Sequence, residues 1–165
     1  MSLSAVVHTL LGVVALVTGA TVLVRRKGDR MHRLVGRVYA VTMATLCLLS
    51  FGLRDTTPMF AGYGPFHVAA VISLVTVTAG VVVAWRRRPG WLEGHYQWMT
   101  WSYIGLVMAT GGHVMHPVFR VLRDVGIHAS VALAVSLFAV WGLPPIIGSR
   151  WLARRKKAWD AVPLS

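Results

Sequence analysis

The sequence predicts an all-α integral membrane protein, a bundle of five transmembrane helices that forms a single transmembrane domain over residues 1–165. Composition is the first observation: 56% of the residues are hydrophobic and only 13% are charged, about half the charged fraction of an ordinary soluble domain. The second is a set of five apolar stretches, each near the roughly 20 residues that a spanning helix needs. The lone cysteine, Cys47, rules out a disulfide-stabilised secreted scaffold.

Short connections rich in glycine and proline separate the predicted helices. Pro117 follows the fourth apolar stretch directly, so we expect that helix to end there and a connection to run from Pro117 to Gly126. Pro144 and Pro145 are expected to kink or end the fifth helix, and a basic tail over residues 150–165 is expected to lie at the membrane interface. The five helices are expected over about residues 5–24, 32–53, 65–85, 95–116 and 127–149.

Basic residues predict the orientation, because Lys and Arg concentrate in the cytoplasmic loops of membrane proteins. Only Arg54, Arg120 and Arg123 fall on the side that holds the second and fourth loops. We therefore expect the N-terminus outside, the C-terminus in the cytoplasm, and anionic lipid headgroups as partners of the basic inner face. The inner side holds Arg25, Arg26, Lys27, Arg30, Arg33, Arg37, Arg86, Arg87, Arg88, Arg150, Arg154, Arg155, Lys156 and Lys157.

Charge placement also excludes two classes of function. The net charge of +12 lies in blocks between apolar stretches, which does not favour nucleic-acid binding. No carboxylate lies inside an apolar stretch, which argues against an ion pump that relays protons or sodium through buried Asp or Glu. No P-loop, nucleophile elbow, zinc-protease or dinucleotide motif is present, so we assign no catalytic residue.

Histidines are the main candidates for a site, and the inner pair leads. His32 opens the second helix and His95 opens the fourth, so the two could hold a haem between facing helices near the inner membrane face. His95 shares one helix face with Met99, Ser102, Leu106 and His113, and His32 shares one with Gly36, Tyr39 and Met43. Gly36 would leave room for the macrocycle, and Arg33 and Arg37 could pair with its propionates. Equally, Gly36 could pack helices together and both arginines could snorkel to the interface.

The outer histidines allow two further interpretations. His67 and His128, which open the third and fifth helices, could hold a second haem, an alternation that resembles two-haem b-type cytochromes in topology alone. Alternatively, His113 and His116 lie three residues apart on the fourth helix and could bind a divalent transition metal such as zinc or copper, with His8, His67 or His128 completing the site. A helix-capping role for the His113–His116 pair fits as well.

Two segments, GDRMHRLVGRVYAVTM (28–43) and HYQWMTWSY (95–103), resemble a bacterial family of predicted membrane proteins known as domain of unknown function 2306. Trp101 stands where the family pattern has a basic residue, and His67, His113, His116 and His128 lie outside the pattern. The resemblance implies a compact multi-helix bacterial membrane protein and supplies no activity. The matching residues are His8, His32, Arg33, Gly36, Arg37, Tyr39, His95, Trp98, Met99, Ser102 and Tyr103.

Together these observations predict a multi-pass protein of a bacterial plasma membrane, with b-type haem and transmembrane electron transfer as the leading function. A metal-binding protein and a non-catalytic scaffold subunit remain alternatives, with a divalent metal or no cofactor respectively. A homo-oligomer or a membrane redox partner is compatible with each.

Overall fold

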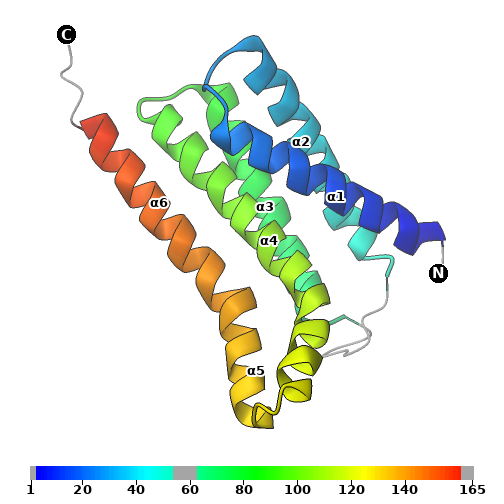
Figure 1. Ribbon diagram of the computed structural model, residues 1–165. Coiled ribbons are helices and arrows are strands. Elements are labelled where there is room, and N and C mark those ends of the chain that lie inside the picture. The colour runs from blue at the N-terminus through cyan, green and yellow to red at the C-terminus, as the bar shows by residue number, and fades with distance from the viewer. Residues whose placement is uncertain (1–2, 54–62, 161–165) are drawn as a thin grey trace. The chain divides into compact units, whose positions relative to one another are not determined.

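A computed structural model describes residues 3–53 and 63–160, and these residues confirm the all-α fold (Figure 1). A π-helical segment, η1, joins α5 to α6 without a break in the helical backbone. The elements are α1 (Leu3–Val24), α2 (Arg30–Ser50), α3 (Pro65–Arg86), α4 (Trp91–Asp124), α5 (Ala129–Leu137), η1 (Phe138–Gly142) and α6 (Leu143–Asp160).

Four of these segments are long and apolar enough to cross a membrane: Leu3–Val24, Arg30–Ser50, Phe66–Arg86 and Ala129–Arg155. The protein is therefore a multi-pass membrane protein, as the composition predicts. The fourth predicted crossing, α4, is not among the four, because histidine, tryptophan, tyrosine and serine side chains dilute its apolar content.

The chain divides into two compact units, an N-terminal unit (Met1–Leu106) and a C-terminal unit (Val107–Ser165), and α4 passes from one into the other. In the N-terminal unit, α1, α2, α3 and the first half of α4 enclose a core. Small residues on α1 allow close packing: Ala15 is fully buried, and a Cβ on Gly19 would collide with the Tyr103 ring and lie 2.8 Å from the Tyr39 ring. The core residues include Tyr39, Met43, Leu46, Cys47, Ala70, Val77, Met99 and Leu106.

Helices α3 and α4 also approach each other through glycines. A Cβ on Gly80 of α3 would lie 2.6 Å from the sulfur of Met99, and one on Gly105 of α4 would lie 3.0 Å from Ser73 Oγ. Such close approach is the usual role of small residues between membrane helices. It brings the backbone of α3 within reach of the side chains of α4.

The C-terminal unit corrects the helix end predicted at Pro117 and excludes a helix end at Pro144 and Pro145. Pro117 lies inside α4, which runs on to Asp124 instead of ending near residue 116; proline is tolerated in membrane helices because neighbouring groups compensate for its missing donor. Pro144 and Pro145 lie in the first turn of α6 and do not end the helix. Instead the backbone widens just before them, where the Leu143 N–H donates to the Phe138 carbonyl five residues back. The chain turns between α4 and α5 at Gly126, whose φ of 85° is left-handed.

Candidate functional site

The α2–α4 contact in the N-terminal unit sets the register of the candidate site. The Tyr39 hydroxyl of α2 lies 2.8 Å from Ser102 Oγ of α4, and both side chains are almost completely buried. Ser102 Oγ donates to the Met99 carbonyl at 3.1 Å, which leaves Tyr39 as the donor to Ser102. This bond fixes one residue of α2 against one residue of α4.

His32 and His95 each lie seven residues before that bond, on α2 and α4 respectively. Seven residues are close to two helical turns, so each histidine lies on the same face as its bonded partner, about 10 Å along the axis. Both helices run in the same direction from this end of the unit (Figure 1). The shared offset therefore places His32 and His95 at the same level of the two helices, two turns before the Tyr39–Ser102 bond.

His95 is half-buried and held in place by α3. Its Nδ1 lies 2.8 Å from the carbonyl oxygen of Gly80. A carbonyl can only accept, so Nδ1 carries a proton, and in the neutral ring Nε2 is the nitrogen with the lone pair. This arrangement, in which a backbone carbonyl fixes the tautomer and ring orientation, is typical of histidines that ligate metal centres through the other nitrogen.

The side chain of His32 is also half-buried, and its Nδ1 is fully buried with no hydrogen-bond partner among the described residues. A buried polar atom without a partner costs about 1–3 kcal/mol. One turn further along α2, a Cβ on Gly36 would meet nothing within 4 Å. Gly36 is thus not a packing glycine in this structure, and the space beside it is open.

An acidic group stands at the start of α2. The Asp29 carboxylate accepts the backbone N–H of His32, and Arg25 lies 3.6 Å away. The hydrogen bond from the His32 backbone, with a smaller contribution from Arg25, holds the pKa of Asp29 below its usual 3.8. Asp29 therefore stays ionised at neutral pH and caps the helix that carries His32.

Arg33 and Arg37, predicted to contact haem propionates, lie exposed on another face of α2. The Arg33 guanidinium donates to the Gly28 carbonyl at 2.7 Å. The described structure does not bring either arginine to the buried face that holds His32, so their pairing with propionates stays a prediction.

The two histidines of the outer pair belong to different units. His67 is buried and both of its ring nitrogens are engaged: Nδ1 accepts from the Gly64 N–H at 3.1 Å, and Nε2 lies 2.9 Å from the Leu53 carbonyl. His128 lies in the other unit, exposed, with Nδ1 2.9 Å from Ser130 Oγ. Coordination by His67 would have to replace one of its hydrogen bonds, and a haem between these two residues stays a prediction.

The alternative metal site has no assembled ligand set within the described residues. Nowhere in residues 3–53 and 63–160 do three His, Cys, Asp or Glu side chains gather as a metal site would require. His113 and His116 are exposed on the part of α4 that belongs to the C-terminal unit, and His8 belongs to the N-terminal unit.

Two contributors to the inner site have no direct signal in the sequence. The Gly80 carbonyl is a backbone group, which residue types do not reveal. The Tyr39–Ser102 bond could have been inferred from the equal offsets of these residues from His32 and His95, a pattern that appears only when the two helices are aligned in parallel.

Comparison with known proteins supports the membrane assignment and supplies no activity. A search of curated proteins and a search of solved structures each returned no match to the chain. A family model described as "Predicted membrane protein (DUF2306)" matches residues 5–148, which include both helices of the inner histidine pair. The chain therefore belongs to this family of predicted membrane proteins.

Proposed function

We propose that this protein binds one b-type haem between His32 of α2 and His95 of α4 and uses it to carry electrons in the membrane. The observation that carries the proposal is the equal spacing of the two histidines from the Tyr39–Ser102 bond, which aligns them across two parallel helices. When bound, haem iron supplies one-electron chemistry, cycling between ferric and ferrous states.

The residues present fit such a group. His95 offers Nε2 while Gly80 holds its Nδ1, and His32 carries a buried nitrogen that lacks a partner. The open space at Gly36 lies on the same helix face as His32. The chain's own contribution would be to orient two neutral imidazoles and to exclude water with the buried residues Tyr39, Met43 and Met99.

The proposal includes a bacterial plasma membrane and five crossings, with α4 as the fourth. No charged residue occurs between Glu93 and Arg120, a length of about 39 Å as helix, which exceeds the roughly 30 Å hydrocarbon core. Crossing by α4 also puts the basic residues of α6 on the same side as Arg25–Lys27 and Arg86–Arg88, as the positive-inside rule requires.

Haem content of purified variants tests the proposal. His32→Ala and His95→Ala should each abolish the haem absorbance, because each removes one axial ligand. His116→Ala, an exposed histidine on the same helix as His95, is the matched control and should retain it. Full haem content in either inner variant would contradict the assignment. An absence of haem from every sample, with stoichiometric zinc or copper instead, would favour a metal-binding function.

A further inference from the structure

A stripe of three arginines lies on a face of α2 other than the one that holds His32. Arg30, Arg33 and Arg37 follow the spacing i, i+3, i+7, so they share one face of the helix over about 10 Å. All three side chains are exposed. His32, Tyr39 and Met43 use a different face of the same helix, so the stripe and the histidine site do not compete.

The surroundings of Arg37 are apolar. Leu34, Val38 and Val41 of the same helix are exposed by 52%, 41% and 67% respectively, and the helix is one of the four membrane-spanning candidates. Arg37 therefore stands about two turns inside a helix whose neighbouring side chains face lipid. A guanidinium at that depth is costly unless it reaches the interface and finds an anion.

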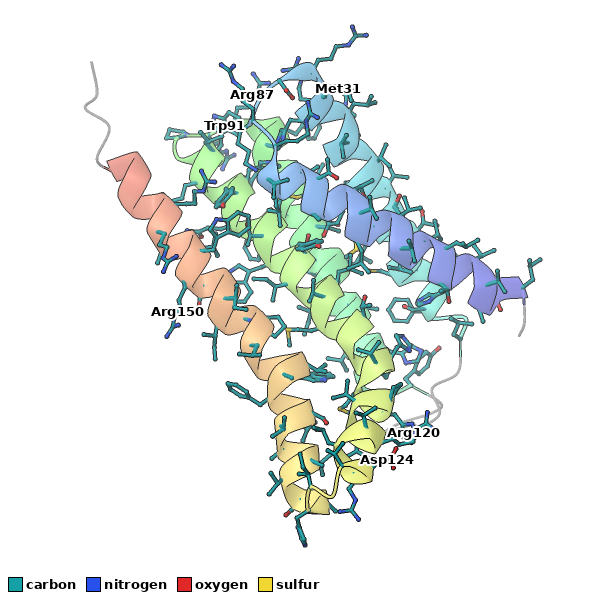
Figure 2. The ribbon with its side chains drawn as sticks, in the orientation of Figure 1. Met31, Arg87, Trp91, Arg120, Asp124 and Arg150 are labelled. Carbon is teal, nitrogen blue, oxygen red and sulfur yellow. The ribbon has the colours of Figure 1, made fainter. Side chains whose placement is uncertain are left out.

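The described residues supply no such anion for the stripe. The acidic residues described in Leu3–Leu106 are Asp29 and Glu93; Asp29 pairs with Arg25, and Glu93 lies within 3.2 Å of Gln97. Arg37 has no hydrogen bond or ion pair with any described residue, and Arg33 contacts only the Gly28 carbonyl. Arg87, just after α3, adds further positive charge to the unit; it is labelled in Figure 2.

We infer that the Arg30–Arg33–Arg37 stripe is a binding site for an anionic phospholipid. Arg33 and Arg37 would donate hydrogen bonds to the phosphodiester. The acyl chains would lie along the exposed side chains Leu34, Val38 and Val41. Guanidinium groups suit this ligand because their planar fork donates two parallel hydrogen bonds to phosphate oxygens. The inference is independent of haem binding and holds for the apo protein.

Native mass spectrometry of the detergent-purified chain tests this site, with phosphatidylglycerol and phosphatidylcholine of identical acyl chains as probes. Wild type should prefer phosphatidylglycerol by at least about tenfold, since each arginine near an anionic headgroup contributes roughly a factor of five. Arg33→Gln/Arg37→Gln should reduce the preference to about twofold or less. Arg86→Gln/Arg88→Gln removes the same amount of charge from exposed residues near the end of α3. This variant should keep most of the preference for phosphatidylglycerol.

Equal losses in the two double variants would overturn the inference, because they would show a diffuse charge effect instead of a site. An unchanged preference in Arg33→Gln/Arg37→Gln would overturn it as well. Arg33→Lys/Arg37→Lys keeps the charge that directs insertion and so should fold and insert like wild type, yet it should bind the lipid more weakly because the planar fork is lost. Wild-type affinity in the lysine variant would contradict the phosphate geometry.

Discussion

At the scale of single residues, packing is most sensitive at positions where one added carbon atom would collide with a neighbouring side chain. Gly19 and Gly12 lie two turns apart on α1 and differ sharply in this respect. A Cβ on Gly19 would collide with the Tyr103 ring, and one on Gly12 would meet nothing within 4 Å. The two glycines therefore form a matched pair for mutation.

Gly19→Ala should destabilise the protein by about 1–3 kcal/mol, because an added methyl overpacks the junction of α1, α2 and α4. Gly12→Ala should be neutral or slightly stabilising, because alanine favours the helix and the space is open. Thermal unfolding in one detergent, followed by circular dichroism, measures both. Equal melting temperatures for the two variants would contradict the packing described for Gly19.

Tyr39→Phe removes the donor to Ser102 while preserving the ring. We expect a loss of about 1 kcal/mol, the ordinary net value of such a bond, together with weaker haem retention, because the bond aligns α2 with α4. Tyr63→Phe is the control, since Tyr63 is exposed and its edge contact with the His67 ring needs no hydroxyl. A haem dissociation rate unchanged by Tyr39→Phe would contradict the claim that the Tyr39–Ser102 bond aligns the two histidines.

At the scale of elements, the start of α2 links stability to pH. The Asp29 carboxylate has a lowered pKa in the folded state, so its contribution is complete above 3.8 and disappears as the pH falls through the folded value. Asp29→Ala should therefore melt below wild type at pH 7, and the gap should close as the pH falls below 3.8. Asp124→Ala, which removes an exposed carboxylate at the end of α4, is the control for the loss of one negative charge. A gap that persists at the acid end would contradict the carboxylate's role.

The sequence predicts the elements better than their ends. Apolar length and glycine-rich connections predict the helical segments, whereas the cap that Asp29 provides to α2 is seen only in the structure. The error at proline is the end predicted for the fourth helix, because α4 continues through Pro117 to Asp124. Before Pro144 the helix continues through the π-helical segment η1. Hydrophobic periodicity does not reveal how a helix continues past a proline, because that continuation depends on backbone hydrogen bonding.

The candidate site was predictable only in part, because side-chain spacing reveals residues on one helix face but not backbone groups of a neighbouring helix. Side-chain stripes on two helices select His32 and His95, and the Tyr39–Ser102 bond joins the same two helices two turns further on. What spacing cannot supply is the third helix: the Gly80 carbonyl reaches His95 only because α3 and α4 pack through glycines. Both hydrogen bonds of His67 likewise depend on backbone groups around a loop, so its engaged state is invisible in the sequence.

At the scale of the whole molecule, the proposed crossing of α4 determines which side each loop occupies. Reporters active only in the cytoplasm should be active after Arg88 and after Ser165, and silent near Tyr63 and after Val125. If α4 does not cross, the positions after Arg88 and Val125 will lie on the same side. That result would reverse the side assigned to the basic end of α6 and contradict the five-crossing topology.

The central claim is that the inner histidine pair holds haem, and a reduced-minus-oxidised difference spectrum of the wild-type protein tests it most directly. The protein should be produced with haem in excess and purified in mild detergent. The account predicts the sharp α-band of a low-spin, bis-histidine b-type haem at about one haem per chain. A featureless difference spectrum from folded, haem-supplied protein would contradict it.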